Sequence, residues 1–291
     1  MHQVFSTPLP ADFLKVYLLK INLLMNYLQL LPCPELQPYV CRFIEIGSQE
    51  LWRDRQAFRI FADGNPGLVF QENPHSFSGN AGELLPQLFI HGLTTRHTAK
   101  TAISPFRNLV VCFQPHALKN IFGFDARELT DTYANLSALI RNDLLEKLSG
   151  TDSFFDRTKL LSGFLLSQIT GNKTKPTQIQ FITEILRKDH DASCLKNLCS
   201  DLKISGRSLE RIMQSYTGVS PKQFSRISRF QSILAHLSNT PVVRLSEAAY
   251  TFGYSDQSHF IRDFREFSGI SPKQFLKHRY PLISFGPDFF E

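Results

Sequence analysis

The chain contains 291 residues, of which 42% are hydrophobic and 20% are charged, a balance typical of globular proteins that excludes the disordered and fibrous classes. Its formal net charge of +6 lies in the last third, because residues 173–291 hold 17 basic and 11 acidic side chains whereas residues 1–172 hold 15 of each. We therefore expect a neutral domain followed by a basic one, for which nucleic acid is the natural partner. The five cysteines show no Cys-x-x-Cys spacing, which argues against a disulfide framework or a zinc ribbon and favours the cytoplasm.

Residues 1–24 are predicted to form an extension ahead of the folded part. The stretch Phe13–Leu31 is apolar, but Lys15 and Lys20 interrupt it, and no run approaches the roughly 18 apolar residues that a membrane span needs. The segment also shows no small-residue cleavage site of the secretory type. We therefore expect no membrane partner.

Residues 25–170 are predicted to form an α+β domain, in which a β barrel or sandwich is followed by helices. Short apolar runs extend to about Pro115, and turn residues at Asp63–Gly67 divide the run Phe58–Gln71. Beyond them the apolar period changes to three or four residues, which predicts an amphipathic helix at Leu136–Leu148. The apolar face of that helix is expected to pack either in the core or in a dimer interface, and the apolar period alone does not decide between these two interpretations.

No pattern typical of a catalytic or metal site occurs in this domain. Its histidines show no H-x-H or H-E-x-x-H spacing, and they are His75, His91, His97 and His116. The sequence also lacks G-x-S-x-G and a glycine-rich phosphate loop. We therefore expect no enzyme activity, no cofactor and no metal. Asp63 is interpreted as a turn residue or, alternatively, as a ligand contact.

The polar segment 171–177, GNKTKPT, is predicted to be a linker. The residues after it, 178–291, follow a helical apolar period to about His278 and form the predicted all-α domain. Two helix-turn-helix motifs joined by a connecting helix are expected within it.

The second motif consists of a helix at Leu245–Phe252, a turn at Gly253, and a reading helix at about Asp256–Phe267 capped by Ser255 or Asp256. The apolar stripe of the reading helix, which must face the core, is Phe260, Phe264 and Phe267. The residues left to face outwards carry groups suited to base edges and phosphates, and they are Gln257, Ser258, Ile261, Arg262 and Arg265.

The same architecture occurs 51 residues earlier, where Arg211 corresponds to Arg262 and Gly218 to Gly269. The predicted buried stripe of this first reading helix is Leu209, Ile212, Met213 and Tyr216. Its predicted outward residues are Arg207, Ser208, Glu210, Arg211 and Gln214.

A nine-residue string is almost repeated, as YTGVSPKQF at 216–224 and FSGISPKQF at 267–275. In each copy the glycine is expected to end a reading helix and Ser-Pro to start the next, so the string positions the reading helix and does not itself read bases. The helix between the motifs, from Pro221 to just before Pro241, is predicted to have about 17 residues and a length of roughly 25 Å. Such a rod would set the reading helices about one turn of DNA apart, roughly 34 Å.

Residues 176–291 resemble the DNA-binding domain of the AraC/XylS family of bacterial transcription regulators. The resemblance is carried by Ala248-Ala249, the string FGYSDQSHF at 252–260, Arg262, Phe264, GISP at 269–272 and Phe275. The front domain resembles an uncharacterised sensor-like domain that precedes such DNA-binding domains. That resemblance is carried by Ala62-Asp63-Gly64, Gly92 and the string VVCFQPHALKNIFG.

The resemblance implies base-contact positions at Arg207, Glu210, Arg211, Gln257, Ser258, Ile261 and Arg262. Ile261 departs from the polar residue often found at its position, and it would touch a thymine methyl or contribute nothing. Glu210 would accept from cytosine N4 or remain solvated. His259 follows the family's Ser-His-Phe pattern and is interpreted as a support for the helix.

We therefore predict a cytoplasmic bacterial transcription regulator, an activator or a repressor, that reads two successive major grooves of double-stranded DNA. Its N-terminal domain is expected to sense a small-molecule effector or to form a homodimer, and RNA polymerase is a further partner that the resemblance implies. The alternative is a DNA-anchored enzyme or small-molecule-binding module. The sequence specifies neither the operator nor the effector.

Overall fold

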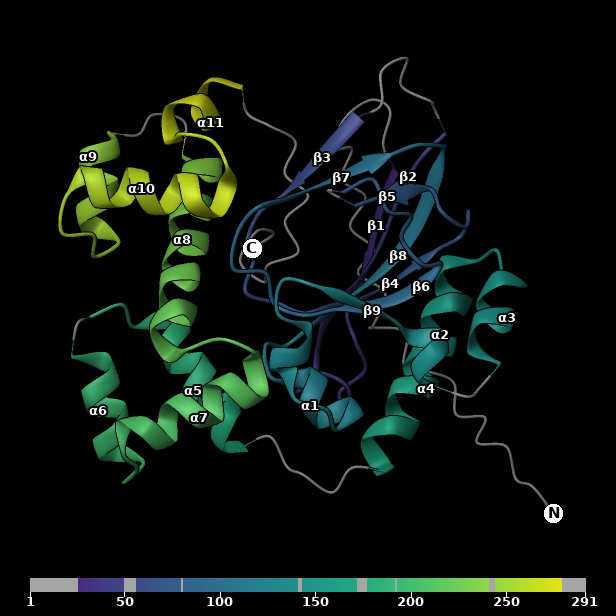
Figure 1. Cartoon of the computed structure of the whole chain (residues 1–291), viewed down its shortest axis with the longest axis horizontal. Helices are drawn as coiled ribbons and strands as arrows, with labels where there is room; N and C mark the ends of the chain where they lie inside the picture. The colour runs from purple at the N-terminus through teal and green to yellow at the C-terminus, as the bar shows by residue number, and fades with distance from the viewer. Residues whose placement is uncertain are drawn as a thin grey trace.

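The computed structural model describes residues 26–49, 56–79, 81–140, 143–171, 177–191, 193–240 and 244–278. A β-rich lobe and an all-helical lobe lie side by side (Figure 1). The predicted order, an α+β domain followed by an all-α domain, is confirmed. The predicted extension at 1–24 lies outside the described residues, as do residues 172–176 of the predicted linker.

The described strands of the β-rich lobe form two antiparallel sheets. The larger has the order β1-β2-β8-β4-β6-β9, and the smaller has the order β3-β7-β5. The strands are β1 (Asn26–Leu30), β2 (Val40–Ser48), β3 (Gln56–Ile60), β4 (Gly67–Gln71), β5 (Phe77–Ser78), β6 (Leu88–His91), β7 (Thr98–Ala102), β8 (Phe106–Phe113) and β9 (Tyr133–Asn135).

The larger sheet separates two apolar layers, because successive side chains on a strand point to opposite faces. On β8, Leu109 and Val111 pack with the helices of this lobe. On its other face, Asn108 and Val110 line the space toward the smaller sheet. The ring of Phe106 lies 4.7 Å, between centroids, from that of Phe77 in the smaller sheet. The described strands thus form a sandwich and not a closed barrel, which decides between the two predicted forms.

The helices of this lobe are α1 (Ala117–Phe122), the 3₁₀ turn η2 (Ala126–Leu129), α2 (Leu136–Leu139), α3 (Leu144–Ser149) and α4 (Phe154–Gly171). The prediction of one continuous helix at Leu136–Leu148 is wrong. Ile140 has an extended backbone with φ −120° and ψ 130°, and it ends α2 after four residues. The apolar period concealed this break, since Leu136 and Leu148 are buried on either side of it.

The helical lobe consists of α5 (Thr177–Lys188), α6 (Cys194–Asp201), α7 (Gly206–Thr217), α8 (Pro221–Asn239), α9 (Leu245–Thr251), α10 (Gln257–Ser268) and α11 (Pro272–His278). The connecting helix α8 has 19 residues. It stands between two helix pairs, with α6 and α7 at one end and α9 and α10 at the other (Figure 1). Both predicted helix-turn-helix pairs are therefore present and joined by one rod.

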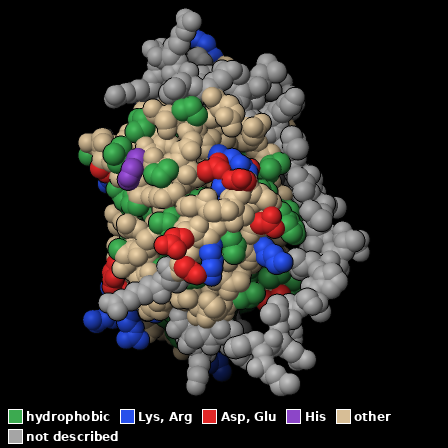
Figure 2. Space-filling model, turned by 90° about the vertical axis from the view of Figure 1, so that its right-hand side faces the viewer, with side chains coloured by type: hydrophobic (Ala, Val, Ile, Leu, Met, Phe, Trp, Pro, Cys, Tyr) green, Lys and Arg blue, Asp and Glu red, His purple; other side chains and the backbone are tan. Residues whose placement is uncertain are grey.

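On the face of the β-rich lobe shown in Figure 2, acidic and basic side chains are interspersed with hydrophobic ones. This mixture agrees with the equal numbers of acidic and basic residues in the first 172 positions. Among the described helices, none has the length and apolar character required to cross a bilayer.

Candidate nucleic-acid interface

The second reading helix, α10, is fixed at both ends and along its inner face. At its start, Asp256 Oδ1 accepts a hydrogen bond from the backbone N–H of His259 at 2.8 Å, which identifies the cap as Asp256. At its end, Gly269 adopts a left-handed conformation with φ 73° that a side chain would disfavour. The three phenylalanines of the predicted stripe are fully buried.

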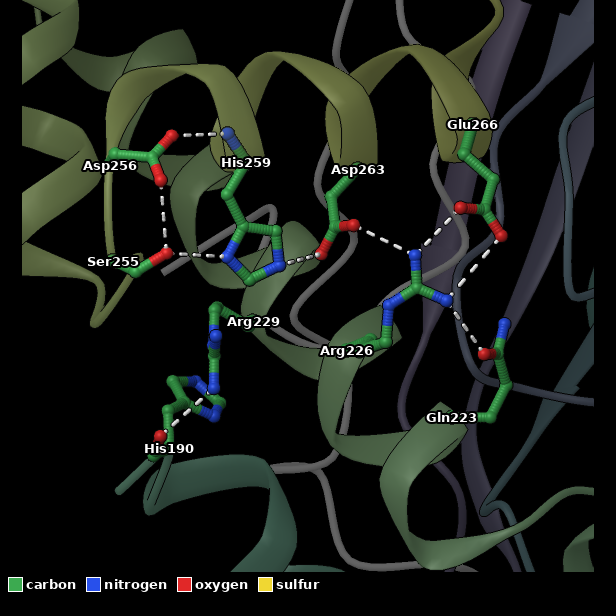
Figure 3. A network of polar contacts seen from close by, with 9 residues as sticks. All are labelled: His190, Gln223, Arg226, Arg229, Ser255, Asp256, His259, Asp263 and Glu266. Carbon is green, nitrogen blue, oxygen red and sulfur yellow. Dashed lines mark hydrogen bonds and ion pairs between the residues drawn. The ribbon is translucent and has the colours of Figure 1, made fainter. Parts of the chain in front are cut away.

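An ionic network ties α10 to the connecting helix α8 (Figure 3). The Arg226 guanidinium of α8 lies 2.7 Å from Asp263 Oδ1 and 2.6 Å from Glu266 Oε2. The Asp263 side chain is only 2% exposed, so without Arg226 it would be a buried carboxylate with no compensating cation on α8. Burial opposes the charge of Arg226, but hydrogen bonds and charges from the two carboxylates outweigh it and raise the pKa of Arg226. The network holds one face of α10 to α8 and leaves the opposite face open.

His259 belongs to the support of α10. Its Nδ1 lies 3.2 Å from Ser255 Oγ, and its Nε2 lies 3.7 Å from Asp263 Oδ2 (Figure 3). Its ring also packs edge-on against Tyr254, with a centroid distance of 5.2 Å. These contacts agree with the interpretation of His259 as a residue that supports the helix.

The contact residues predicted on α10 lie mostly on its open face. Gln257, Ser258, Arg262 and Arg265 are exposed. Neither arginine has an acidic partner within 4.0 Å in the described parts of the chain. Ile261 differs, because it is half-buried and packs against the core beneath the helix. Four of the five predicted positions on this helix are thus fully presented to a partner.

The first reading helix, α7, presents a comparable face. Ser205 caps it by accepting a hydrogen bond from a backbone N–H three residues along, at 3.1 Å. Arg207 and Arg211 are exposed, and they too lack an acidic partner among the described residues. Glu210 is half-buried and accepts a hydrogen bond from Gln214 Nε2 at 3.1 Å. Its carboxylate is therefore engaged on its own helix.

The buried stripe predicted for α7 is confirmed in part. Leu209 and Met213 are buried, whereas Ile212 and Tyr216 are half-buried. Tyr216 lies at the end of α7 that meets the β-rich lobe, where Lys119 Nζ of α1 lies 5.0 Å from its ring centre. A sequence period identifies an apolar face but does not identify which lobe covers it.

The β-rich lobe contacts both reading helices at the same position of the repeat. At the first helix, Thr130 Oγ1 donates a hydrogen bond to Gly218 O at 3.0 Å, and a Cβ on Gly218 would collide with that hydroxyl. At the second, a Cβ on Gly269 would lie 2.6 Å from the ring of His97, and His97 Nδ1 lies 3.2 Å from the backbone oxygen of Glu266. The repeated glycines thus mark two docking points as well as two helix ends. The sequence signal for this docking role was the glycine itself, because a residue without a Cβ lets another segment of the chain approach its backbone closely.

Two residues of the loop between β3 and β4, Phe61 and Ala62, enter the core of the helical lobe. The Ala62 N–H donates to Phe267 O of α10 at 3.1 Å, and the side-chain amide of Gln231 on α8 donates to Ala62 O. This contact was not predicted, because two apolar residues next to a turn look like the end of an ordinary strand.

A cavity of about 150 Å³ lies between the two sheets of the β-rich lobe. Its walls are mostly apolar and include Phe58, Phe77 and Phe106. Asp63 also lines it. Asp63 Oδ1 accepts a hydrogen bond from the Asn65 N–H at 3.1 Å, and burial raises the pKa of Asp63 to about 7. Asp63 is therefore a turn residue that also lies in the wall of a cavity.

The four histidines considered as metal ligands each approach a backbone carbonyl oxygen. His75 lies 3.2 Å from Leu85 O, His91 lies 3.0 Å from Gly92 O, His97 lies 3.2 Å from Glu266 O, and His116 lies 3.1 Å from Pro38 O. Burial lowers the pKa of His116 to about 4 and also lowers that of His91. Among the described residues, no group of three His, Cys, Asp or Glu side chains could hold a metal ion.

Comparisons with known proteins match both lobes. A helix-turn-helix domain model matches residues 198–278, and a domain of unknown function (DUF6597) matches residues 28–135. The XylDLEGF operon transcriptional activator 1 of Pseudomonas putida is 29% identical over 111 residues, which are 38% of this chain and 33% of that protein. The HTH-type transcriptional activator RhaS of Salmonella newport (strain SL254) is 29% identical over 122 residues, which are 41% of this chain and 42% of that protein. The chain thus spans between a third and a half of the length of these curated relatives.

Among solved structures, a ToxT structure from Vibrio cholerae aligns over 87% of this chain and 97% of its own, with a TM-score of 0.46 and 11% identity. A second ToxT structure, bound to (E)-4-(8-methylnaphthalen-1-yl)but-3-enoic acid, aligns over 78% of this chain and 96% of its own, with a TM-score of 0.45 and 12% identity. At this level of likeness neither structure supports an inference about the function of this chain.

Proposed function

We propose that this chain, which belongs to the AraC/XylS family through its C-terminal domain, is a sequence-specific DNA-binding regulator of transcription. The observation that carries the proposal is the pair of exposed arginine faces on α7 and α10, joined by the 19-residue helix α8. The matching helix-turn-helix model covers both reading helices, and the relatives described above are named as transcriptional activators. A reading helix of this kind enters the major groove of DNA.

The exposed arginines are assigned to phosphates or to guanine edges, which are the usual partners of arginine in DNA complexes. They are Arg207, Arg211, Arg262 and Arg265. Gln257 and Ser258, in the first turn of α10, are assigned to base edges because both are exposed there. Glu210 and Ile261 receive smaller roles, since the first is hydrogen-bonded within its helix and the second packs on the core.

The β-rich lobe is assigned the regulatory role, because it contacts both reading helices at Gly218 and Gly269. A small-molecule effector that changed these contacts would change how the two helices are presented to DNA. Activation through RNA polymerase, homodimerisation, and action in the cytoplasm without catalytic activity complete the proposal.

The test is selection of a duplex by the purified full-length protein from a random DNA pool, followed by mobility-shift titrations. Arg211→Ala and Arg262→Ala should each weaken binding of the selected duplex by about 1–3 kcal/mol. Arg244→Ala is the matched control, because Arg244 is an exposed arginine of the same lobe that pairs with Glu247 and lies outside the reading helices. Specific binding should also fall as salt rises, since each neutralised phosphate releases counterions.

If Arg244→Ala lowers the affinity for the selected duplex as much as Arg211→Ala and Arg262→Ala do, the DNA contacts assigned to Arg211 and Arg262 are wrong. Failure to select any duplex, or an affinity that does not change with salt, would contradict the proposed function as a whole.

A further inference from the structure

The loops of the β-rich lobe that dock on the two reading helices are themselves joined. Thr130, which donates a hydrogen bond to the terminal glycine of α7, lies in the loop between η2 and β9, residues 130–132. His97, which meets the terminal glycine of α10, lies in the loop between β6 and β7, residues 92–97. We call these two segments the bridging loops. Because the end of β6 pairs with the start of β9 in the larger sheet, the two loops leave that sheet side by side.

Side-chain and backbone contacts connect the bridging loops to each other. Asp131 accepts one hydrogen bond from the Thr95 backbone N–H and another from the Thr95 hydroxyl, both at 2.6 Å. Hydrogen bonds to a carboxylate are stronger than those between neutral groups. The Asp131 N–H donates in turn to Leu93 O at 3.1 Å, and a Cβ on Gly92 would collide with the backbone oxygen of Leu129. The two loops therefore form one unit between the ends of α7 and α10.

The backbone of Asp131 has an uncommon conformation. Its φ of 58° lies in the left-handed region, which most side chains disfavour and which aspartate and asparagine tolerate best. Asp131 is exposed, so packing in a core does not require this conformation. A residue of this kind keeps such a φ where the surrounding contacts impose it. Here the imposing contacts are those with Thr95 and Leu93 of the other bridging loop.

A second connection between the reading helices matters because a single helix does not hold them at one angle. The 19 residues of α8 span roughly 28 Å at 1.5 Å per residue. Helices of this length bend gently, and a bend in α8 changes both the distance and the angle between α7 and α10. The bridging loops contact the C-terminal ends of α7 and α10. They therefore close a ring with α8 and oppose any bend that would separate the two ends.

We propose that the bridging loops set the spacing between the two DNA half-sites that the chain recognises, with Asp131 as the positioning residue. This inference rests on the proposed function, because it concerns the same two reading helices. One additional base pair between the half-sites moves the second by about 3.4 Å along the duplex and turns it by roughly 34°. Reading helices held at both ends cannot follow that shift, whereas helices connected through α8 follow part of it. The β-rich lobe thus contributes to DNA specificity through geometry and needs no base contact of its own.

The test compares two duplexes in mobility-shift titrations of the full-length protein. The first is selected by the protein from a random pool and its half-sites are located by footprinting, and the second carries one base pair inserted between them. The spacing ratio is the dissociation constant for the inserted duplex divided by that for the selected duplex. We expect a ratio of about tenfold or more for the natural chain, and Asp131→Gly should lower it about fivefold.

Asp131→Gly is suited to this test because it removes both hydrogen bonds from Thr95 while glycine adopts a positive φ freely. The contacts of Ala62 with α8 and α10 remain in the variant, so the two lobes stay together. A variant that was merely less stable would bind both duplexes less tightly and leave the spacing ratio unchanged.

Three further variants separate the bridging contact from other effects. Asp131→Asn should keep the natural spacing ratio, because the amide oxygen still accepts from the Thr95 N–H and asparagine tolerates a positive φ. Thr95→Val, which removes the hydroxyl alone, should lower the ratio by less than Asp131→Gly does. Asp143→Gly is the matched control, since Asp143 is an exposed aspartate of the same lobe that pairs with Lys147 of α3, on the side away from the helical lobe (Figure 1).

A spacing ratio that Asp131→Gly leaves unchanged, or that Asp143→Gly lowers equally, overturns the assignment of Asp131. A natural chain that binds the inserted duplex as tightly as the selected one overturns the role of the bridging loops. In each of these cases the chain still selects a duplex, so the proposed DNA-binding function stands. A chain that selects no duplex refutes that function and the spacing role together.

Discussion

In both helix-turn-helix units, a hydroxyl just before the terminal glycine closes the reading helix in the same way. Thr217 Oγ1 lies 2.7 Å from the carbonyl oxygen four residues earlier and 3.4 Å from the one two residues later. Ser268 Oγ makes the same two contacts at 2.5 Å and 3.1 Å. The glycines that follow, Gly218 and Gly269, have φ values of 84° and 73°. The repeat therefore encodes the end of the reading helix.

The reading helices α7 and α10 differ in the contacts that stabilise them along their length. In α10, buried Asp263 pairs with Arg226 of α8, whereas the corresponding residue of α7 is the apolar Ile212. On α7, Ser215 instead donates a hydrogen bond to Asp125 of the β-rich lobe at 3.2 Å. The comparison shows that α10 is held by ionic contacts within its own lobe and that α7 depends more on the neighbouring lobe. The two copies of the repeat thus share the way in which the reading helix ends, whereas the contacts along the side of each helix differ.

The largest expected effect comes from removing the ionic support of α10. Arg226→Met leaves the Asp263 carboxylate, 2% exposed, without its partner, and should lower the free energy of unfolding by about 3 kcal/mol. Urea unfolding of the full chain measures this loss. Arg229→Met is the control, because Arg229 lies on the same helix but donates to a backbone oxygen, His190 O at 2.9 Å.

The apolar solution used by the first unit provides the rescue. Adding Asp263→Ile to Arg226→Met gives α10 the residue that α7 has at the same position. Most of the lost stability should return, because no buried carboxylate is then left unpaired; Glu266, the other partner of Arg226, is 33% exposed and can be solvated by water. If the double variant is no more stable than Arg226→Met, an apolar residue at this position of α10 does not replace the ionic contact, and the comparison with Ile212 of α7 fails.

A smaller effect is expected at the repeated glycines. Gly218→Ala should cost about 2 kcal/mol, because alanine pays roughly 1–2 kcal/mol in the left-handed region and its Cβ also meets Thr130 and the backbone oxygen of Ala126. Gly269→Ala should cost less, about 1 kcal/mol, since its Cβ meets the exposed side chain of His97, which can turn away. Urea midpoints of the two variants test this order, and equal losses would show that the β-rich lobe does not hold α7 more firmly than α10.

The parts of the molecule that could be predicted from sequence are those set by local chemistry. The two reading helices, their glycine ends and the start of α8 at Ser220-Pro221 follow from capping residues and an apolar period. The outward position of Arg211 and Arg262 follows from the same period. The open arginine surface of each unit was therefore accessible to sequence reasoning.

The parts that could not be predicted depend on contacts between distant segments. No local pattern indicates that Phe61 packs against Phe230, 169 residues away in the chain, or that Thr130 reaches Gly218. The break at Ile140 was missed because buried leucines continue the period on both sides of it.

The smallest expected effect is a response to pH that reaches only the second unit. One of the contacts of the β-rich lobe with α10 runs through the loop that holds Asp63, whose pKa burial raises to about 7. Its contact with α7 involves Asp125, whose pKa is lowered to about 2, mainly by a hydrogen bond from Arg127. Near neutral pH only the first of these carboxyl groups titrates. His91, in the same cavity wall, stays uncharged there because burial lowers its pKa.

The sign of the response follows from the direction of the shift. The folded chain holds the Asp63 proton more tightly than the unfolded chain, so the associated stability is full below about pH 4 and is lost as pH rises through about 7. Between pH 6.5 and 7.5 the loss should be below about 1 kcal/mol. Hydrogen exchange of the Ala62 amide, which donates to Phe267 O, should quicken over this range beyond its intrinsic rate, while the Gly218 amide does not. Asp63→Asn should remove the difference, because the amide keeps the acceptor for Asn65 but carries no charge. A pH response that persists in that variant, or that appears equally at Gly218, would mean that the two lobes respond as one body and that the second unit has no separate control.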